Sequence, residues 1–158
     1  MTTRRDFLIL AGGAAAGLPR LAQAQLPPNI AALRKQALEE AIRKTTGGAE
    51  LKKGKVKLEV PPLIDNGNSV PVTVKVESPM TPEDHVRAIH LFTEKNPQPY
   101  IINAHLGPRS GRATVTTRAR IADSGRVIAI AQLSDGSFWT DEVPVVVTLS
   151  ACLEDGLI

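Results

Sequence analysis

Cys152 is the single cysteine of the 158-residue chain and lies six residues before its last residue. A thiolate can accept a sulfur group, exchange with another thiol or hold a partner chain covalently. Cys152 follows the last apolar strand pattern, and a position so near the terminus favours an exposed side chain. The alternative is a buried, inert cysteine acting as a small apolar residue. A lone cysteine excludes an intrachain disulfide framework and a multi-cysteine zinc site.

Three histidines are the other candidates for metal or acid–base chemistry: His85, His90 and His105. With Cys152 and Met80 they supply the residue types of a cupredoxin-like copper site. Such a site has a His and a Met shortly after the cysteine, and the residues that follow Cys152 do not provide them. We therefore expect no metal and no other cofactor. His90 is expected to be a hydrogen-bonded structural residue, and His105 is the histidine best placed for a function, although a structural role is favoured there too.

The remaining motifs give little support for an enzyme. The glycine pair at 47–48 lacks the lysine pattern of a phosphate-binding loop. Ser137 is flanked by Asp135 and Asp141, but no histidine is near in sequence. Because the members of a catalytic triad can come from distant parts of a fold, this spacing neither supports nor excludes a triad. The basic turn at 109–112 could hold an anion, and a solvated loop is its more frequent role. We expect a protein that is not itself a catalyst.

Residues 1–24 have the pattern of an export signal. Arg4 and Arg5 precede a short apolar stretch at 7–18, and an Ala-Gln-Ala cleavage motif ends at Ala24. The paired arginines favour the twin-arginine route, and the stretch is too short for a membrane-spanning helix. We expect a periplasmic protein with no membrane span.

Removal of residues 1–24, which hold three arginines and one aspartate, would leave 134 residues with a formal charge of +1 instead of +3. Nearly neutral charge gives no basis for binding nucleic acid or acidic membranes. Aromatic residues make up only 3% of the chain, too few for a base-stacking surface.

A helix is predicted within residues 25–48. Asn29 can cap it, and the glycine pair at 47–48 can end it. Its apolar positions recur at helical spacing and predict one buried stripe. They are Ile30, Leu33, Ala37, Leu38, Ala41 and Ile42.

Residues 55–150 are predicted to form one antiparallel β-sandwich, because apolar residues alternate and turn signals recur. The last two strands are more continuously apolar, which predicts burial on both faces. The predicted strands are 56–60, 70–77, 86–92, 100–104, 113–121, 127–133 and 143–149.

Six ordered segments resemble SoxY, the substrate-carrying subunit of the bacterial thiosulfate-oxidising Sox system. They run from about the helix to the last strand, and the twin-arginine signal also fits that family. The segments are 66–72 (NGNSVPV), 78–81 (SPMT), 90–92 (HLF), 96–97 (NP), 108–113 (PRSGRA) and 133–139 (LSDGSFW).

The resemblance implies an all-β, immunoglobulin-like sandwich with one N-terminal helix, paired with a second sandwich subunit, SoxZ. It further implies a C-terminal arm, here residues 151–158, whose cysteine carries sulfur intermediates covalently between periplasmic enzymes. By alignment that cysteine is Cys152. The enzymes implied are a c-type cytochrome that couples thiosulfate to the thiol and a metal-dependent hydrolase that releases sulfate.

The tail departs from the family pattern, which typically ends Gly-Gly-Cys-Gly-Gly. Residues 150–158 read Ser-Ala-Cys-Leu-Glu-Asp-Gly-Leu-Ile. Ser150 and Ala151 stiffen the approach to the sulfur, and Leu153 adds bulk beside it. Glu154, Asp155 and the terminal carboxylate disfavour the thiolate and repel anions. Two alternatives to a standard carrier follow: a carrier of a different cargo, and a binding module with an inert Cys152 whose apolar tail packs onto a partner.

Overall fold

The structure is a computed structural model that describes residues 28–149; residues 1–27 and 150–158 lie outside the described part. One α-helix precedes nine strands and one short 3-10 turn in residues 28–149. The elements are α1 (Pro28–Thr46), β1 (Leu51–Lys52), β2 (Val56–Glu59), β3 (Leu63–Ile64), β4 (Val70–Val76), β5 (Val86–Thr93), β6 (Tyr100–His105), η1 (Pro108–Ser110), β7 (Thr114–Ala119), β8 (Gly125–Leu133) and β9 (Phe138–Val147).

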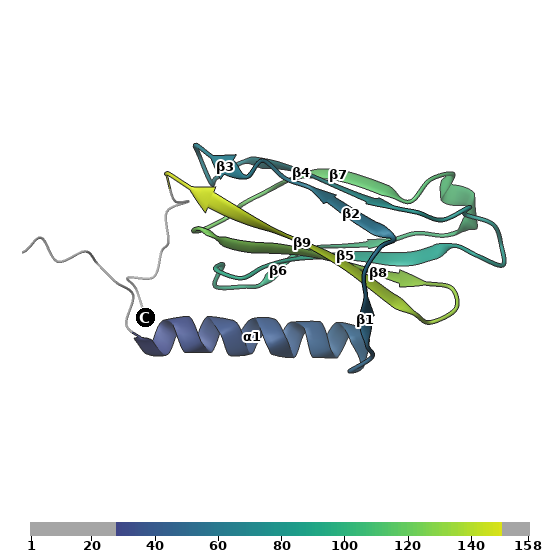
Figure 1. Cartoon of the computed structure of the whole chain (residues 1–158), viewed down its shortest axis with the longest axis horizontal. Coiled ribbons are helices and arrows are strands. Elements are labelled where there is room, and N and C mark those ends of the chain that lie inside the picture. The colour runs from purple at the N-terminus through teal and green to yellow at the C-terminus, as the bar shows by residue number, and fades with distance from the viewer. Residues whose placement is uncertain (1–27, 150–158) are drawn as a thin grey trace, which may run out of the picture.

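Two sheets stack face to face (Figure 1). The larger sheet has the order β1-β9-β8-β5-β6, with β3 also paired to β9, and the smaller has the order β2-β4-β7. The pairs among β2 and β4 to β9 are antiparallel, whereas the two-residue strands β1 and β3 run parallel to β9. The predicted all-β sandwich with one N-terminal helix is confirmed.

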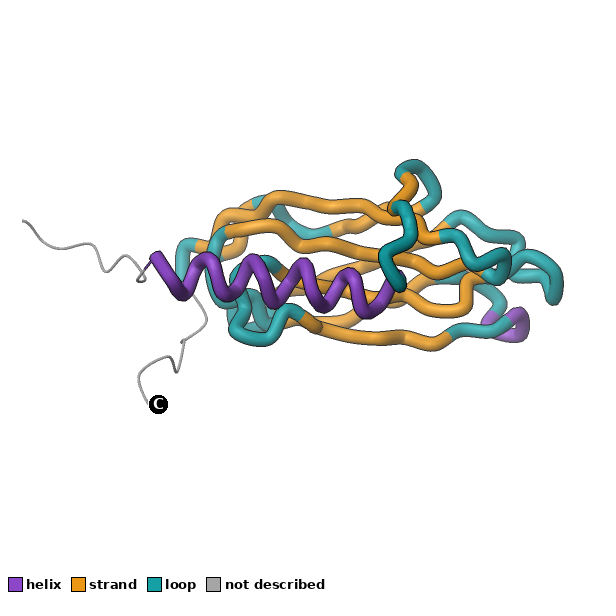
Figure 2. The backbone as a smooth tube through the Cα atoms, turned by 90° about the horizontal axis from the view of Figure 1, so that it is seen from below, coloured by secondary structure: helices purple, strands orange, loops and turns teal. Residues whose placement is uncertain are grey.

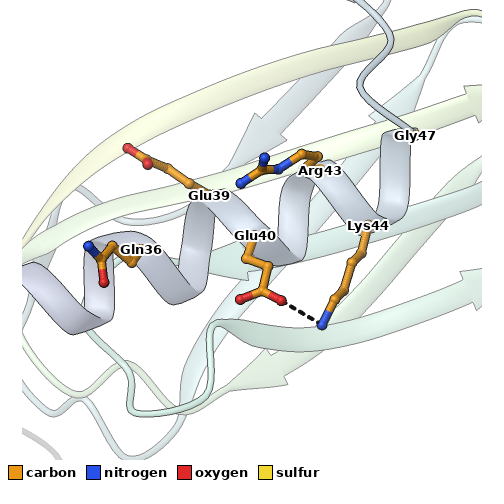
Figure 3. A pocket seen from close by; sticks show the side chains of 6 residues that line it. All are labelled: Gln36, Glu39, Glu40, Arg43, Lys44 and Gly47. Atoms are coloured by element: carbon orange, nitrogen blue, oxygen red, sulfur yellow. Dashed lines mark ion pairs between the residues drawn. The ribbon is translucent and has the colours of Figure 1, made fainter.

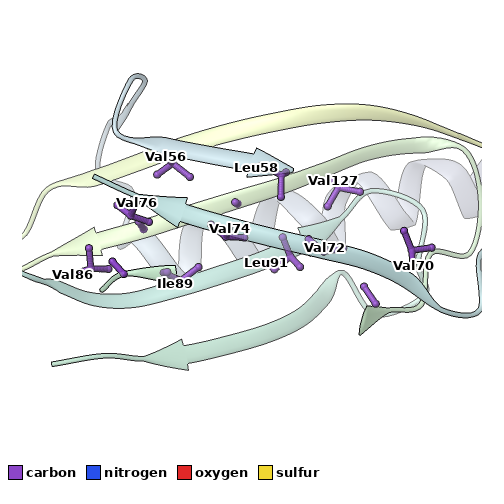
Figure 4. Packing of buried hydrophobic residues seen from close by; sticks show 14 of the residues in the cluster. Val56, Leu58, Val70, Val72, Val74, Val76, Val86, Ile89, Leu91 and Val127 are labelled. Atoms are coloured by element: carbon purple, nitrogen blue, oxygen red, sulfur yellow. The ribbon is translucent and has the colours of Figure 1, made fainter. Parts of the chain in front are cut away.

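The main core lies between the two sheets (Figure 4). In β4, Val70, Val72 and Val74 are at most 2% exposed, and the residues between them point outward. They pack against Ile89 and Leu91 of β5 in the same cluster. Burying such a side chain contributes about 1.5–3 kcal/mol. The inward-facing residues of the period-two pattern therefore stabilise the packing of the two sheets.

Helix α1 lies along the outer face of the larger sheet (Figure 2). Leu38 and Ala41 are buried against Phe92, Ile130 and Phe138. This second, smaller core makes the larger sheet apolar on both faces in its central strands, as the continuous run in β8 predicts.

Two details of the predicted helix are wrong. Asn29 does not cap it, because α1 begins at Pro28 and Asn29 lies inside the first turn, where proline is well tolerated. Leu33 is 60% exposed, and Arg34 takes the buried position in that turn. The rest of the predicted stripe is confirmed, since Leu38 and Ala41 are buried and Ile42 packs against the same core. The predicted end is confirmed, since the helix stops at Thr46 before two glycines with positive φ.

The seven predicted strands correspond to β2 and β4 to β9, with shifted ends. Burial of residues 143–149 on both faces is wrong: Val146 is 56% and Leu149 is 61% exposed, while Val145 and Val147 are buried. The reason is that the outer face of this part of β9 is not covered by α1: the strand residues buried in the second core are Phe92, Ile128, Ile130 and Phe138, and none lies within 143–149. The two-residue strands β1 and β3, which pair with β9, were not predicted.

Candidate functional site

Cys152 lies outside the described residues, so the candidate site is described from the residues that lead to it. We call residues 147–149 the arm root, because they are the last described residues before the predicted arm. Thr148 donates its backbone N–H to the carbonyl of Ile64 at 2.9 Å. The backbone amide of Gly67 donates to the carbonyl of Leu149 at 3.0 Å. The arm root is thus paired with the β3–β4 connection beyond the end of β9.

A second loop holds the other edge of the arm root. The backbone amide of Val147 donates to the hydroxyl oxygen of Ser124 at 2.9 Å. Ile121 donates its amide to the carbonyl of Gly67 at 2.8 Å, which links the two loops. The arm root is therefore fixed at one end of the sandwich, at the tip of β9 (Figure 1). The sequence marked both loops as turns, but it gave no sign that they bind the arm root.

Three exposed apolar side chains surround the arm root. Leu63 is 59%, Val146 56% and Leu149 61% exposed. Leu63 and Val146 are directly paired in the parallel β3–β9 ladder. This end of the molecule therefore presents apolar surface where the arm begins, next to the exposed Asp65, whose carbonyl accepts the hydroxyl of Thr148.

Covalent geometry limits how far Cys152 can be from the arm root. Cys152 is the third residue after Leu149, and an extended chain spans at most about 3.6 Å per residue. The Cα atom of Cys152 therefore lies within about 11 Å of that of Leu149. Any protein that reacts with the thiol must approach this end of the sandwich.

The histidines do not form a metal site. His90 is 9% exposed, and its Nδ1 lies 2.8 Å from Oδ1 of Asn103, which confirms the predicted structural role. Met80 is buried, and its sulfur accepts the backbone amide of Val86 at 3.5 Å. His105 is exposed at the end of β6. Within residues 28–149 no group of three or more His, Cys, Asp or Glu residues could hold a metal ion.

Ser137 belongs to a turn-stabilising network. Its hydroxyl donates to Asp135 at 2.7 Å and accepts the indole N–H of Trp139 at 3.0 Å. The hydrogen bonds from Ser137 lower the pKa of Asp135 below its ordinary value. Asp141 is used elsewhere, accepting the backbone amide of Leu58 at 2.8 Å. Asp135 and Ser137 thus stabilise the β8–β9 hairpin, and Asp141 connects β9 to β2. The three residues do not form a nucleophile–base pair.

The two other sequence motifs lie away from the arm root. The basic turn at 109–112 overlaps the end of η1 and is exposed, at the end of the sandwich opposite the tip of β9 (Figure 1). The glycine pair at 47–48 ends α1, where both residues have positive φ. Neither motif contributes to a site around Cys152.

The charged face of α1 forms an open hollow (Figure 3). Its side chains include an ion pair between Glu40 and Lys44 at 2.8 Å. The hydrogen bond from Lys44 lowers the pKa of Glu40, as expected for a solvated i,i+4 pair. The hollow is a solvent-facing helix surface and carries no acid–base pair matched for catalysis.

No helix among the described residues is long and apolar enough to cross a bilayer.

Solved structures with the same fold include a sulfur carrier and several superoxide reductases. The sulfur carrier protein SoxY from Chlorobium limicola f thiosulfatophilum is similar at 24% identity and TM-score 0.61, over 75% of this chain and 97% of that one. A superoxide reductase (neelaredoxin) from Ignicoccus hospitalis is similar at 24% identity and TM-score 0.54, over 71% and 90%. A superoxide reductase from Nanoarchaeum equitans is similar at 16% identity and TM-score 0.52, over 61% and 100%. These likenesses establish the fold.

The family comparison is more specific. No curated protein matches the chain. The family model "Sulfur oxidation protein SoxY" matches residues 42–152, more than two thirds of the chain, and the matched range includes Cys152. The sandwich, the helix and the strand that leads to the lone cysteine all lie in or beside this range, and the chain belongs to the SoxY family of sulfur oxidation proteins.

Proposed function

We propose that this protein carries sulfur intermediates covalently on Cys152 and presents them to partner enzymes. The observation that carries the proposal is the SoxY family match, which runs through residue 152 and so includes the single thiol. Within residues 28–149, His90, Ser137, Asp135 and Asp141 have structural contacts, which favours a carrier over an enzyme. The thiol is the group on which cargo would be held.

The proposed chemistry begins with oxidative coupling. The Cys152 thiolate and thiosulfate form a sulfur–sulfur bond, giving a cysteine S-thiosulfonate, and the two electrons released pass to a c-type cytochrome. A metal-dependent hydrolase then adds water across the terminal sulfur–sulfur bond. Sulfate and one proton leave, and a persulfide stays on Cys152. The carrier supplies the attachment atom and the partner enzymes supply the catalysis.

The arm root supports this role by its position. It is hydrogen-bonded on two sides, so the arm starts from a fixed point. Leu149 is exposed, so that point is open to an approaching protein. A short tether from a rigid base keeps the cargo within about 11 Å of one surface, which raises its effective concentration for an enzyme docked there.

We further propose that the protein is exported by the twin-arginine route to the periplasm and works there as a heterodimer with a SoxZ-like sandwich subunit. The pattern in residues 1–24 supports export, and family membership supports the partner. A folded heterodimer could leave the cytoplasm on the signal of one subunit. The domain scheme is then a signal at 1–24, the helix, the sandwich and the arm.

Mass spectrometry of the intact protein, purified from periplasm of thiosulfate-grown cells, tests the carrier role. The wild type should show reducible adducts with the mass of sulfane sulfur or thiosulfonate, and the Cys152→Ser variant should show none. An unmodified thiol under all conditions, together with slow labelling of Cys152 in the native protein, would instead favour the binding module with an inert cysteine. Adducts of another mass would indicate a carrier with a different cargo.

A further inference from the structure

Strand β6 is an exposed edge of the larger sheet. Among the described residues, it stands at the end of the order β1-β9-β8-β5-β6 and pairs with β5 alone. Its sequence, Tyr-Ile-Ile-Asn-Ala-His, holds no Asp, Glu, Lys, Arg or Pro. Edge strands present unpaired backbone groups, and proteins usually protect them with charges, proline or very short length. Six uncharged residues give β6 none of these protections.

The other edges of the described sheets are protected. Lys57 and Glu59 of β2 form an ion-pair cluster with Lys75, at 3.4 Å and 2.8 Å. Strand β7 carries Arg118, which donates to Ser69. On the larger sheet, β1 and β3 are only two residues long. Charges or short length therefore disfavour the pairing of a further strand at these edges, whereas β6 has neither feature.

A small groove adjoins the first residue of β6. It has a volume of about 290 Å³ and lies between α1 and residues 98–100. Its apolar lining comes from Ala37, Ala41, Pro99 and Tyr100, and the Glu40–Lys44 ion pair borders it (both side chains labelled in Figure 3).

Tyr100 connects the groove to the strand. Its hydroxyl pairs with the hydroxyl of Thr45 and donates to the carbonyl of Ala41, so the groove wall is fixed to α1. Its ring packs on Phe92 at 4.7 Å, and the residue is 38% exposed. An uncharged edge beside a preformed apolar groove is what recognition by strand addition uses: backbone bonds supply affinity and the groove supplies specificity.

The edge is also well placed for a permanent partner of a carrier. Three strand spacings separate β6 from β9, about 14 Å at about 4.8 Å each. Cys152 follows Leu149, just past the end of β9, and can lie no further than about 11 Å from it. A subunit seated on β6 therefore leaves the arm root and the apolar side chains around it free for enzymes. A subunit covering Leu63 and Val146 would compete with them.

We propose that β6 and the adjoining groove are the docking site of the SoxZ-like subunit. That subunit adds an uncharged, extended strand to β6 and places an apolar side chain between Pro99 and Ala41. The inference rests on the proposed function, because the need to leave the arm free is what selects a permanent hetero-partner over other occupants.

The test uses the full chain co-purified with the SoxZ-like subunit of the same organism. His105→Lys puts a charge on the edge at an exposed position, and Ala37→Phe fills the groove without changing a residue of β6. Each should weaken the complex by about tenfold or more in a Kd measurement. Thr116→Lys, the same added charge on exposed β7, is the control and should leave the Kd within about twofold. Circular dichroism should show that all three variants are folded.

Hydrogen exchange locates the contact independently. Amides within residues 100–105 should gain protection in the complex. The proposal is overturned if no complex forms, if protection appears at β2, β7 or the Leu63–Val146 surface, or if a homodimer is found that His105→Lys dissociates. Adduct formation on Cys152 is measured separately, so a carrier with a different interface is distinguished from a protein that carries nothing.

Discussion

The carbonyl oxygen of Leu149 accepts the backbone amide of Gly67 at 3.0 Å, and the carbonyl oxygen of Gly67 accepts that of Ile121 at 2.8 Å. One glycine in the β3–β4 connection thus joins the end of the last strand to the loop before β8. The chain leading to Cys152 is tied into the sandwich until three residues before the thiol. Among the described residues, the last contact before the thiol is therefore made at this turn and not at the end of β9.

Ser124 is expected to hold the last residue of β9 in place. Its hydroxyl oxygen accepts the backbone amide of Val147, so Ser124→Ala leaves a largely buried donor without its partner. The expected cost is about 1–3 kcal/mol of unfolding free energy, measured by urea denaturation. The amide of Val147 should also exchange with solvent faster than in the wild type.

Ser124→Thr is the matched control, because it keeps the hydroxyl. It should retain slow exchange at Val147 and most of the stability. Equal exchange rates in the wild type and Ser124→Ala would contradict the role of the hydroxyl and leave the Gly67 turn as the main restraint on the arm root.

Two leucines of α1 test how the helix is docked. Leu38 is 3% exposed against Phe92 and Ile130, whereas Leu33 is 60% exposed. Leu38→Ala should cost about 2–5 kcal/mol, the usual range for a buried leucine. Leu33→Ala should change stability by no more than about 0.5 kcal/mol. Similar losses for the two variants, in parallel thermal and urea melts, would show that the helix buries a different face.

The strands could be predicted because their burial follows a period of two that is visible in the residues. Val70, Val72 and Val74 alternate with outward side chains, and each is buried. The helix face was harder, since Leu33 and Arg34 exchange the roles that hydrophobicity alone assigns them. The strands β1 and β3 could not be predicted, because a two-residue strand has no period and exists only through its parallel pairing to β9.

For the candidate site, the sequence identified the thiol and could not identify its setting. A lone cysteine after a last strand is a local feature. The contacts of Gly67 and Ser124 with the arm root join residues far apart in the chain, and nothing local marks them. Likewise, Val146 was predicted to be buried as part of 143–149, and its exposure beside Leu63 depends on which elements cover β9 in the fold.

The β8–β9 turn should lose stability in acid through Asp135. Hydrogen bonds from Ser137 hold the pKa of Asp135 below its ordinary value, with smaller contributions from Lys55 and Lys52. A lowered pKa in the folded state stabilises the protein above the ordinary value, and this contribution is lost as pH falls through the folded pKa. Asp135→Asn should therefore lower the Tm at neutral pH by no more than about 4 °C, since the group is exposed. The difference should shrink as the pH falls through the lowered pKa of Asp135 in the folded protein.

Ser137→Ala is the companion variant, because it removes the largest cause of the shift and leaves the carboxyl in place. The difference in Tm between Ser137→Ala and the wild type should decrease with falling pH in the same way as for Asp135→Asn. A deficit for Asp135→Asn that is constant from pH 7 to pH 2 would show that the aspartate acts through the shape of the turn and not through its charge.

The acidic tail should make Cys152 a slow nucleophile. Glu154 and Asp155 follow the thiol closely in sequence, and nearby negative charge disfavours the thiolate that reacts. The double variant Glu154→Gln with Asp155→Asn should therefore react faster with iodoacetamide at pH 7 and low salt, by about twofold to fivefold. The gain should shrink at about 1 M salt, where exposed charges are screened. A larger gain with thiosulfate-dependent loading than with the neutral reagent would show that the same charges also repel the anionic substrate. Equal alkylation rates at low salt would instead mean that the bulk of Leu153, tested by Leu153→Gly, limits access to the sulfur.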